Sequence, residues 1–197
     1  MTLSSCTSTA NTDSSETTAI TENAALECIF TRTSVRQFQP DRSISRDTVE
    51  TLLRAAMSAP TAVNKQPWAF VAVDNRQELD SLSASLPYAR MLKEASLAIV
   101  TCADLSKSID GEDFQRGFWI QDVSAATENL LLAAHALGLG AVWTGVYPDA
   151  ERVKAVQQRL GMPEHIIPLA VVPIGYPTGS QTPKDKWNTE NIHFNRW

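Results

Sequence analysis

The stretch from Phe118 to Leu137 constrains the fold most, because it predicts a long helix that is apolar on nearly every side. A helix of this kind lies either at the centre of a core or in an interface between subunits. Gly138 and Gly140 end it, and Gly138 stands where a left-handed C-terminal cap is expected. The apolar residues that spread around the helix are Val123, Ala126, Leu130, Leu131, Leu132, Ala134 and Leu137.

Shorter helices and short apolar strands are expected on both sides of this helix. The expected helices are Ala24–Phe30, residues 45–57 with Ser45 as N-cap, Gln77–Leu86, and a segment that begins at Asp149 and ends at Gly161. The expected strands are Phe70–Val73, Leu97–Cys102, Ala141–Gly145 and Ile166–Ile174. The sequence contains no internal repeat and no GxGxxG or Walker motif, which excludes the commonest nucleotide-binding folds.

The chain divides into a tail over residues 1–23 and one folded domain over residues 24–197. The tail has almost no large apolar residue, so it cannot bury enough surface to offset the entropy of ordering and should be flexible. The whole chain of 197 residues is 43% hydrophobic and 20% charged, which is a globular balance. Within the domain, the polar loop Ser106–Gly117 is expected to be a lid or an entrance. The final stretch Thr178–Trp197 has no helical period, but its aromatic residues suggest that it packs along something.

Charge and composition exclude several classes of protein. A net charge of −5 without a basic run argues against nucleic acid as a partner, and no apolar run is long enough for a transmembrane segment. The three cysteines and three histidines are scattered, so no protein-ligated metal is expected.

The sequence leaves two locations open. A cytoplasmic protein is expected, with Cys6 a chance cysteine in a polar tail. Alternatively, Leu3-Ser4-Ser5-Cys6 resembles the end of a bacterial lipoprotein signal. If a longer precursor exists, the protein would be anchored in the bacterial envelope by a lipid on Cys6.

The stretch from Ala59 to Trp68 predicts a stiff loop between a helix and a strand. Pro60 ends the helix and Pro67 fixes φ before the strand. The loop carries a hydroxyl and two side-chain amides that suit a planar ligand with heteroatoms on its rim, or that merely satisfy the backbone of the turn. These residues are Thr61, Asn64 and Gln66.

Two further segments are candidates for ligand binding. Arg32, Ser34 and Arg36 alternate, so in an extended segment they would lie on one side and could hold a phosphate, or form a solvated basic edge. The strand Ala141–Gly145 runs into a small-residue end, where the backbone can approach a ligand closely.

Four motifs together resemble the FMN-dependent nitroreductase family: TRTSVRQF from Thr31, APTAVNKQPWAF from Ala59, LGLGAVWTG from Leu137, and IGYP followed by PKDKW near the end. Their order and spacing carry the resemblance, which covers about residues 26–197. It implies an α+β fold with a mostly antiparallel central sheet flanked by helices. It also implies an intertwined homodimer with two FMN molecules at the subunit interface.

The resemblance implies one group of residues around the flavin phosphate and ribityl chain. Thr33 stands where a second arginine is common in the family, which is a departure from the pattern. The implied residues are Arg32, Thr33, Ser34, Arg36, Lys184 and Lys186.

A second group is implied around the isoalloxazine ring. The loop residues of this group are Pro60, Thr61, Asn64 and Gln66, and Thr61 replaces a serine that is frequent in the family. Trp143, Thr144 and Gly145 match the segment whose backbone amides face N5 and O4 of the ring. The flavin performs the chemistry, so no catalytic side chain is implied.

The implied activity is transfer of a hydride from NADH or NADPH to N5 of FMN, and then reduction of a nitroaromatic, a quinone or a similar small flat acceptor. Other readings remain open. One is an enzyme of the same fold that removes halogen from aromatic rings or fragments flavin. The other is a protein that binds flavin without catalysis.

Overall fold

The computed structural model describes residues 23–111 and 116–197. The predicted tail lies outside these residues, apart from Asn23, and so does Cys6. Part of the predicted entrance loop, residues 112–115, is also outside them. Asn23 is the N-cap of helix α2 (Ala24–Thr31), because its side chain accepts hydrogen bonds from the N–H groups of Ala25 and Leu26.

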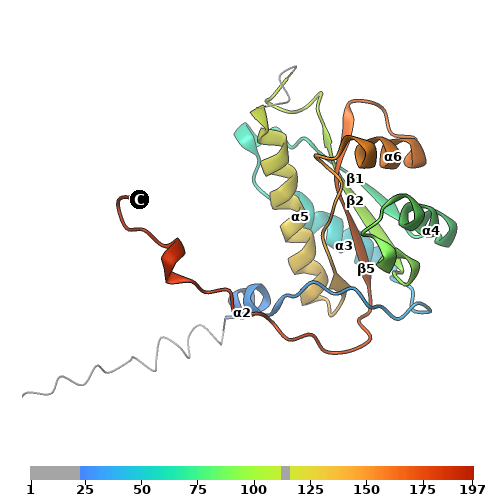
Figure 1. Ribbon diagram of the computed structural model, residues 1–197, viewed down its shortest axis with the longest axis horizontal. Helices are drawn as coiled ribbons and strands as arrows, with labels where there is room; N and C mark the ends of the chain where they lie inside the picture. The colour runs from blue at the N-terminus through green and yellow to red at the C-terminus, as the bar shows by residue number, and fades with distance from the viewer. Residues whose placement is uncertain (1–22, 112–115) are drawn as a thin grey trace, which may run out of the picture.

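An antiparallel sheet forms the centre of the domain, and the predicted α+β class is confirmed. Its strands run in the order β1-β2-β5-β3, and β4 also pairs with β5 (Figure 1). The long strands β2 and β5 are buried over most of their length. The strands are β1 (Trp68–Val73), β2 (Leu97–Asp104), β3 (Gly140–Ala141), β4 (Thr144–Gly145) and β5 (Ile166–Gly175).

The observed strands differ from the predicted ones in several bounds and in one break. β2 and β5 end later than predicted, at Asp104 and Gly175 instead of Cys102 and Ile174. The first strand begins at Trp68 rather than Phe70, because Trp68 already pairs with Ala103 of β2. The predicted strand Ala141–Gly145 is broken into β3 and β4. Pro173 of β5 lies opposite the break, and it has no N–H to donate to the ladder.

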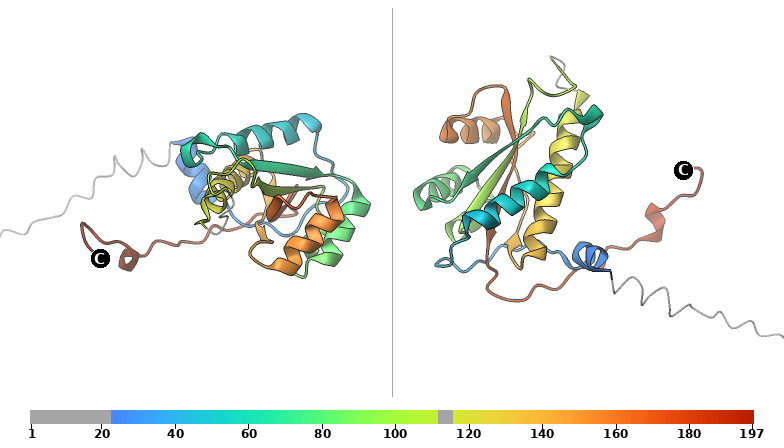
Figure 2. Two further views of the ribbon diagram at one scale, coloured as in Figure 1. Left: turned by 90° about the horizontal axis from the view of Figure 1, so that it is seen from above. Right: turned by 180° about the vertical axis from the view of Figure 1, so that it is seen from behind.

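Helices cover both faces of the sheet (Figures 1 and 2). Helices α3 (Arg46–Met57) and α5 (Phe118–Ala136) pack on one face, against side chains such as Ile99 and Val172. Helices α4 (Arg76–Ser85) and α6 (Ala150–Leu160) pack on the other face, against neighbours such as Val100 and Val171. Successive strand residues point to opposite faces, so the sheet has a core on each side.

Helix α5 belongs to the core, which was one of its two predicted settings. Trp119, Val123 and Leu130 are fully buried, whereas Leu137, just after the helix, is 45% exposed. The predicted caps are confirmed. Ser45 and Asp149 accept hydrogen bonds from the first turns of α3 and α6, and Gly138 and Gly161 have φ of 71° and 63°.

The segment from Ser34 to Phe38 crosses the edge of the sheet over two glycines. Gly140 of β3 pairs with Gly175 of β5, and the Val35 N–H donates to the Ala141 carbonyl at 3.0 Å. A Cβ at Gly140 would lie 2.6 Å from Val35, and a Cβ at Gly175 would lie 2.9 Å from Phe38. The glycines therefore let the crossing segment lie directly on the strands.

The C-terminal stretch Thr178–Trp197 leaves the body of the protein as an extended arm (Figures 1 and 2). Every residue of the arm is exposed, including Trp187 and Phe194, and Trp197 has 101% relative exposure. The arm contains the short turn η4 (Thr189–Asn191). Its aromatic residues are thus not packed into the core of their own chain.

No helix in residues 23–111 and 116–197 is both long and apolar enough to cross a membrane.

Candidate functional site

The loop between α3 and β1 is held in an unusual backbone conformation. It contains the short helix η1 (Ala62–Asn64), and Val63, Asn64 and Gln66 have φ of 42°, 55° and 51°. These values lie in the left-handed region, which is costly for a β-branched residue such as Val63. Polar side chains of the loop bond within it. The Gln66 N–H donates to the Thr61 hydroxyl at 3.0 Å, and the Gln66 amide donates to Asn64 Oδ1 at 2.9 Å. These internal bonds support the predicted stiffness of the loop, which is here called the stiff loop, and Pro60 lies at its start.

A buried carboxylate from α5 fixes this loop, and the sequence analysis did not identify it. Asp122 Oδ1 accepts a hydrogen bond from the Ala62 N–H at 2.8 Å, while Asp122 Oδ2 is buried without a hydrogen-bond partner. The residue is only 4% exposed. Burial raises the pKa of Asp122, the Ala62 N–H opposes this shift, and the charge of Asp110 adds to it. Asp110 is itself fixed by the N–H groups of Phe118 and Trp119.

A cavity among the described residues, here called cavity one, has a volume of about 640 Å³ and lies beside β4. It brings together four of the predicted site residues, which are Arg36, Trp143, Thr144 and Gly145. A Cβ built at Gly145 would meet no atom within 4 Å, so the strand backbone faces open space there. This volume is ordinary for a small-molecule site.

Cavity one also contains residues that the sequence analysis missed. Tyr88, Arg90 and Met91 come from the start of the short helix η2 (Arg90–Lys93) and the residues before it, and Arg152 comes from α6. Only the tertiary fold brings these elements to β4. The one signal in the sequence was that Pro87 and its neighbours follow a predicted helix, where a surface loop is expected.

Arg152 links several parts of cavity one. Its Nε lies 3.1 Å from Asp149 Oδ2, and its Nη1 donates to the Gly145 carbonyl at 3.4 Å. Its guanidinium carbon lies 5.1 Å from the centre of the Tyr88 ring, within the range of a cation–π contact. The side chain is therefore held close to the strand end at Gly145.

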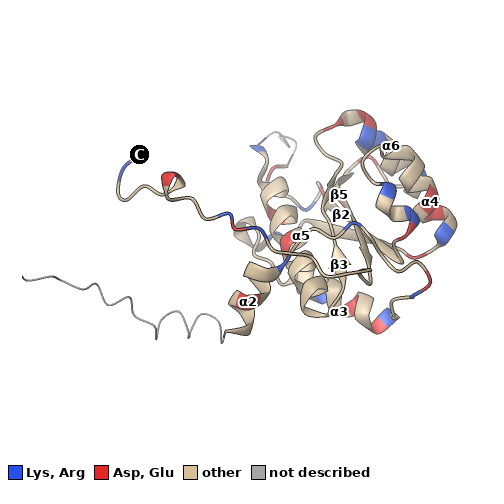
Figure 3. Ribbon diagram, turned by 60° about the horizontal axis from the view of Figure 1, so that its bottom comes forward, with Lys and Arg blue, Asp and Glu red and all other residues tan. Residues whose placement is uncertain are grey.

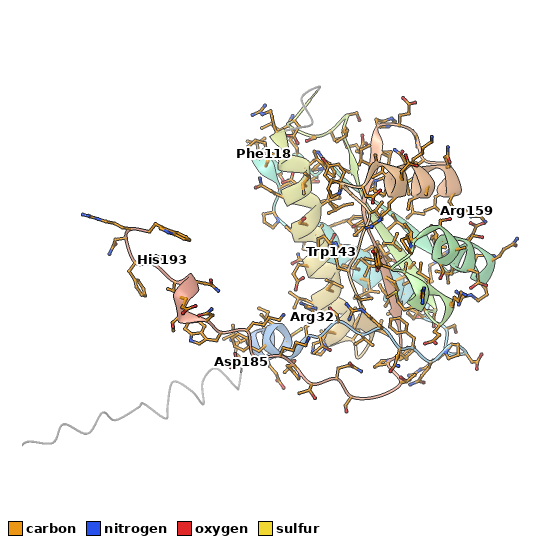
Figure 4. All side chains as sticks on the ribbon, viewed as in Figure 1. Arg32, Phe118, Trp143, Arg159, Asp185 and His193 are labelled. Carbon is orange, nitrogen blue, oxygen red and sulfur yellow. The ribbon has the colours of Figure 1, made fainter. Side chains whose placement is uncertain are left out.

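A second cavity, here called cavity two, lies between α2 and the beginning of the arm and has a volume of about 500 Å³. It brings together Arg32, Lys184 and Lys186 from the two ends of the domain. Figure 4 shows Asp185 of the arm beside α2 and near Arg32, whereas His193 lies away from the body. Basic residues of the arm lie beside α2 in Figure 3. The cavity therefore has three cations and one carboxylate, Asp185, in its lining, which leaves a net positive charge for an anion.

Arg32 and Arg36 do not lie in the same cavity, although they alternate in the sequence. Arg32 is the C-cap of α2, and its Nε forms an ion pair with Glu128 of α5 at 3.0 Å. The end of the helix thus directs Arg32 away from the course of the following segment. Ser34 is exposed and forms an isolated bridge with Ala141. Thr33 lines another hollow, of about 320 Å³, with His135 among its neighbours.

Within the described residues, no residue of the stiff loop lines cavity one or cavity two. Asp122, which holds the loop, and Glu128, which holds Arg32, are six residues apart on α5. Their side chains therefore point in directions about 120° apart around the helix axis. Cavity one includes residues of η2 and α6, on the face of the sheet opposite to α3 and α5. Most of the predicted site residues thus form three separate groups in one chain, while Thr33 and Ser34 line neither of the two cavities.

The charged groups that line the two cavities are mostly cations, with Asp185 as the one carboxylate among the lining residues of the described chain. This excess of positive charge suits an anionic ligand. Cys102 is buried, and burial raises the pKa of its thiol to about 12, so the thiol stays protonated. Within the part of the chain that is described, no cluster of three or more His, Cys, Asp or Glu residues could hold a metal ion.

Comparison with known proteins gives a consistent family. The Nitroreductase family model matches residues 29–98 and 81–176. A protein of Archaeoglobus fulgidus, provisionally named NADH dehydrogenase/NAD(P)H nitroreductase, is 46% identical over 177 residues, covering 87% of this chain and 98% of the relative. A crystal structure of a protein from Parabacteroides distasonis with the same provisional name has a TM-score of 0.83 and 46% identity, covering 89% of this chain and 100% of the other. A provisionally named nitroreductase from Desulfovibrio desulfuricans, solved in complex with FMN, has a TM-score of 0.75 and 26% identity, covering 89% and 99%.

Proposed function

The chain belongs to the nitroreductase family, and from this premise we propose that it is an FMN-dependent oxidoreductase that uses NADH or NADPH to reduce a small flat acceptor. Nitroaromatics and quinones are the acceptor classes that we expect. The observation that carries the proposal is cavity one, where Arg36 and the open backbone at Gly145 share one space. FMN, when bound, would supply the chemistry of accepting a hydride and of passing the electrons on to the acceptor.

The chemistry of cavity one fits the ring of FMN. A planar ring needs polar backbone groups at its rim and open space beside them, and β4 offers both at Thr144 and Gly145. Amide dipoles at that edge would stabilise the negative charge that reduction places on the ring. Arg36 adds a full positive charge to the same cavity. These groups would bind and orient the ring, and no side-chain acid or base is assigned.

Cavity two fits the phosphate end of the same cofactor. Arg32, Lys184 and Lys186 could give a phosphate several charge-assisted hydrogen bonds. The ion pair of Arg32 with Glu128 would hold the guanidinium in place for the phosphate. Ser34, on the segment between Arg32 and Arg36, would then lie along the connecting ribityl chain, and Thr33 beside it.

A second copy of the chain would complete the site. The stiff loop with Pro60, Thr61, Asn64 and Gln66 is the third group of site residues, and none of these four lines cavity one or cavity two of its own chain. We therefore propose a homodimer in which the loop of one subunit meets the ring held by the other. The exposed aromatic residues of the arm support this assembly, because a second subunit would cover them.

The test is to purify the protein, load it with FMN, and follow the flavin absorbance after NADPH is added without air. We expect a yellow protein that bleaches and that regains its colour when a quinone or a nitroaromatic is added. A yellow protein that never bleaches would favour a role in binding flavin without catalysis. A protein that cannot be loaded with FMN would reject the proposed function.

A further inference from the structure

Cavity one holds more positive charge than the flavin ring requires. Arg36, Arg90 and Arg152 all line it. Of these three arginines, only Arg152 has a carboxylate partner within the described part of the chain, which is Asp149 at 3.1 Å. Arg36 suits the edge of the ring. The single carboxylate of Asp149 cannot neutralise both Arg90 and Arg152. Cavity one therefore has room for an anion in addition to the ring.

An anion in cavity one would be distinct from the phosphate of FMN. The cations proposed for that phosphate line cavity two, and the two cavities share no lining residue. Arg90 and Arg152 belong to η2 and α6, whereas Arg32 lies on the α5 side of the molecule. With the phosphate of FMN in cavity two, the anion of cavity one would belong to a second molecule.

The position of Arg152 indicates what this molecule is. Its bond to the Gly145 carbonyl places the guanidinium next to the strand end proposed for the N5 edge of the ring. A hydride donor must bring its nicotinamide to that edge, and its diphosphate follows one ribose away. Tyr88 is 70% exposed and offers a flat face beside Arg152. The two arginines are thus located where the charged part of the donor must lie.

We propose that Arg90 and Arg152, with the ring of Tyr88, bind the diphosphate bridge of NADH or NADPH. This inference rests on the proposed function, since it assigns the donor subsite of the same cavity. The subsite takes no part in electron transfer. It increases the affinity of the enzyme for the donor through charge-assisted hydrogen bonds to the diphosphate oxygens.

The experiment compares the natural donors with 1-benzyl-1,4-dihydronicotinamide, which has the same reacting ring but no phosphate. The FMN-loaded Arg90→Ala/Arg152→Ala variant should show a KM for NADH and NADPH raised by about tenfold or more. Its kcat at saturation should stay close to that of the unaltered enzyme. The rate with the benzyl donor should not change, and the salt dependence of kcat/KM for NADPH should become weaker.

Matched variants separate this subsite from general effects. Lys93→Ala/Lys154→Ala removes two positive charges from the same two elements, η2 and α6, outside cavity one, and should keep the KM for NADPH. Arg90→Ala alone alters an exposed side chain and should still raise KM. Arg152→Lys keeps the charge and should restore most of the affinity.

Two results would overturn the inference. One is an equal loss of rate with the benzyl donor, because Arg152 would then act only by holding Gly145. The other is an unchanged KM for NADPH together with a raised KM for an anionic acceptor such as nitrobenzoate, but not for neutral nitrobenzene. If neither donor reduces the unaltered protein, the proposed function itself fails and the subsite with it.

Discussion

Asp122 and Ala62 are joined by a hydrogen bond of 2.8 Å between a buried carboxylate of α5 and the N–H of the stiff loop. The two residues are sixty positions apart, and the bond is made next to three residues with positive φ. A loop in such a conformation persists only when its surroundings determine it. Asp122 is therefore the contact by which the core fixes the geometry of the loop.

Asp122→Ala should loosen the loop, because the Ala62 N–H loses its acceptor in a buried place. We expect the free energy of unfolding to fall by about 1–3 kcal/mol and the retention of FMN to weaken. Asp122→Asn keeps an acceptor oxygen and should retain more of the FMN affinity. Urea unfolding and FMN titration measure the two effects. Equal FMN affinity in the alanine variant and the unaltered protein would show that the loop does not depend on this bond.

The stability of the protein should depend on pH through Asp122. Burial raises the pKa of this carboxyl in the folded state, so the folded protein binds the proton more tightly than the unfolded chain does. The stabilisation is present at low pH and is lost as the pH rises through the raised pKa. The Tm of Asp122→Asn minus that of the unaltered protein should thus increase from about pH 4 to about pH 7. A constant difference over this range would contradict the raised pKa.

Gly145→Ala should separate cofactor binding from stability. The added methyl meets no protein atom, so the free energy of unfolding should stay within about 0.5 kcal/mol. The same methyl would enter the space proposed for the ring, and the FMN affinity should fall by about tenfold or more. Gly179→Ala on the exposed arm is the control, because a Cβ there also meets nothing within 4 Å. Unchanged FMN affinity in Gly145→Ala would place the ring elsewhere.

Arg32→Ala and Lys186→Ala should each weaken FMN binding, because both residues line cavity two. We expect the Kd of FMN to rise by about tenfold or more in each variant, with the fold intact by circular dichroism. The affinity for riboflavin, which lacks the phosphate, should change much less. Arg54→Ala, which removes an exposed helical arginine paired with Glu50, is the control. Undiminished FMN affinity in both variants would refute a shared phosphate site.

Removal of residues 188–197 should weaken the proposed dimer and leave the fold of each subunit intact. The deleted part of the arm is exposed, and it includes Phe194 and Trp197 but neither Lys184 nor Lys186. Sedimentation should show a larger monomer fraction at equal protein concentration, and the far-ultraviolet circular dichroism should retain its helical signal. An unchanged dimer would mean that this end of the arm does not hold the subunits together.

The parts of the fold that the sequence predicted are those that depend on local chemistry. The caps at Ser45 and Asp149 follow from a side-chain oxygen just before an apolar helical face, and Gly138 follows from the left-handed turn at the end of α5. The break between β3 and β4 was missed, because it depends on Pro173 in a strand that comes later in the chain.

The candidate site also divides into residues with a local signal in the sequence and residues that only the tertiary fold brings together. The loop from Pro60 to Gln66 carries proline and amide signals in one short segment, so it could be recognised. Arg152 and Tyr88 carry no such signal, since they become neighbours only when α6 and η2 pack on the sheet. The ion pair between Arg32 and Glu128 also joins residues that are ninety-six positions apart.

The two facing glycines, Gly140 and Gly175, make the crossing segment in effect an additional strand, laid on the sheet with no layer of side chains beneath it. The backbone of Arg36 is therefore restrained by β3 and β5 and is less mobile than the backbone of a surface loop. If this edge of the sheet unfolded locally on heating, the Arg36 guanidinium would leave cavity one. Local unfolding and release of the ligand would then occur together.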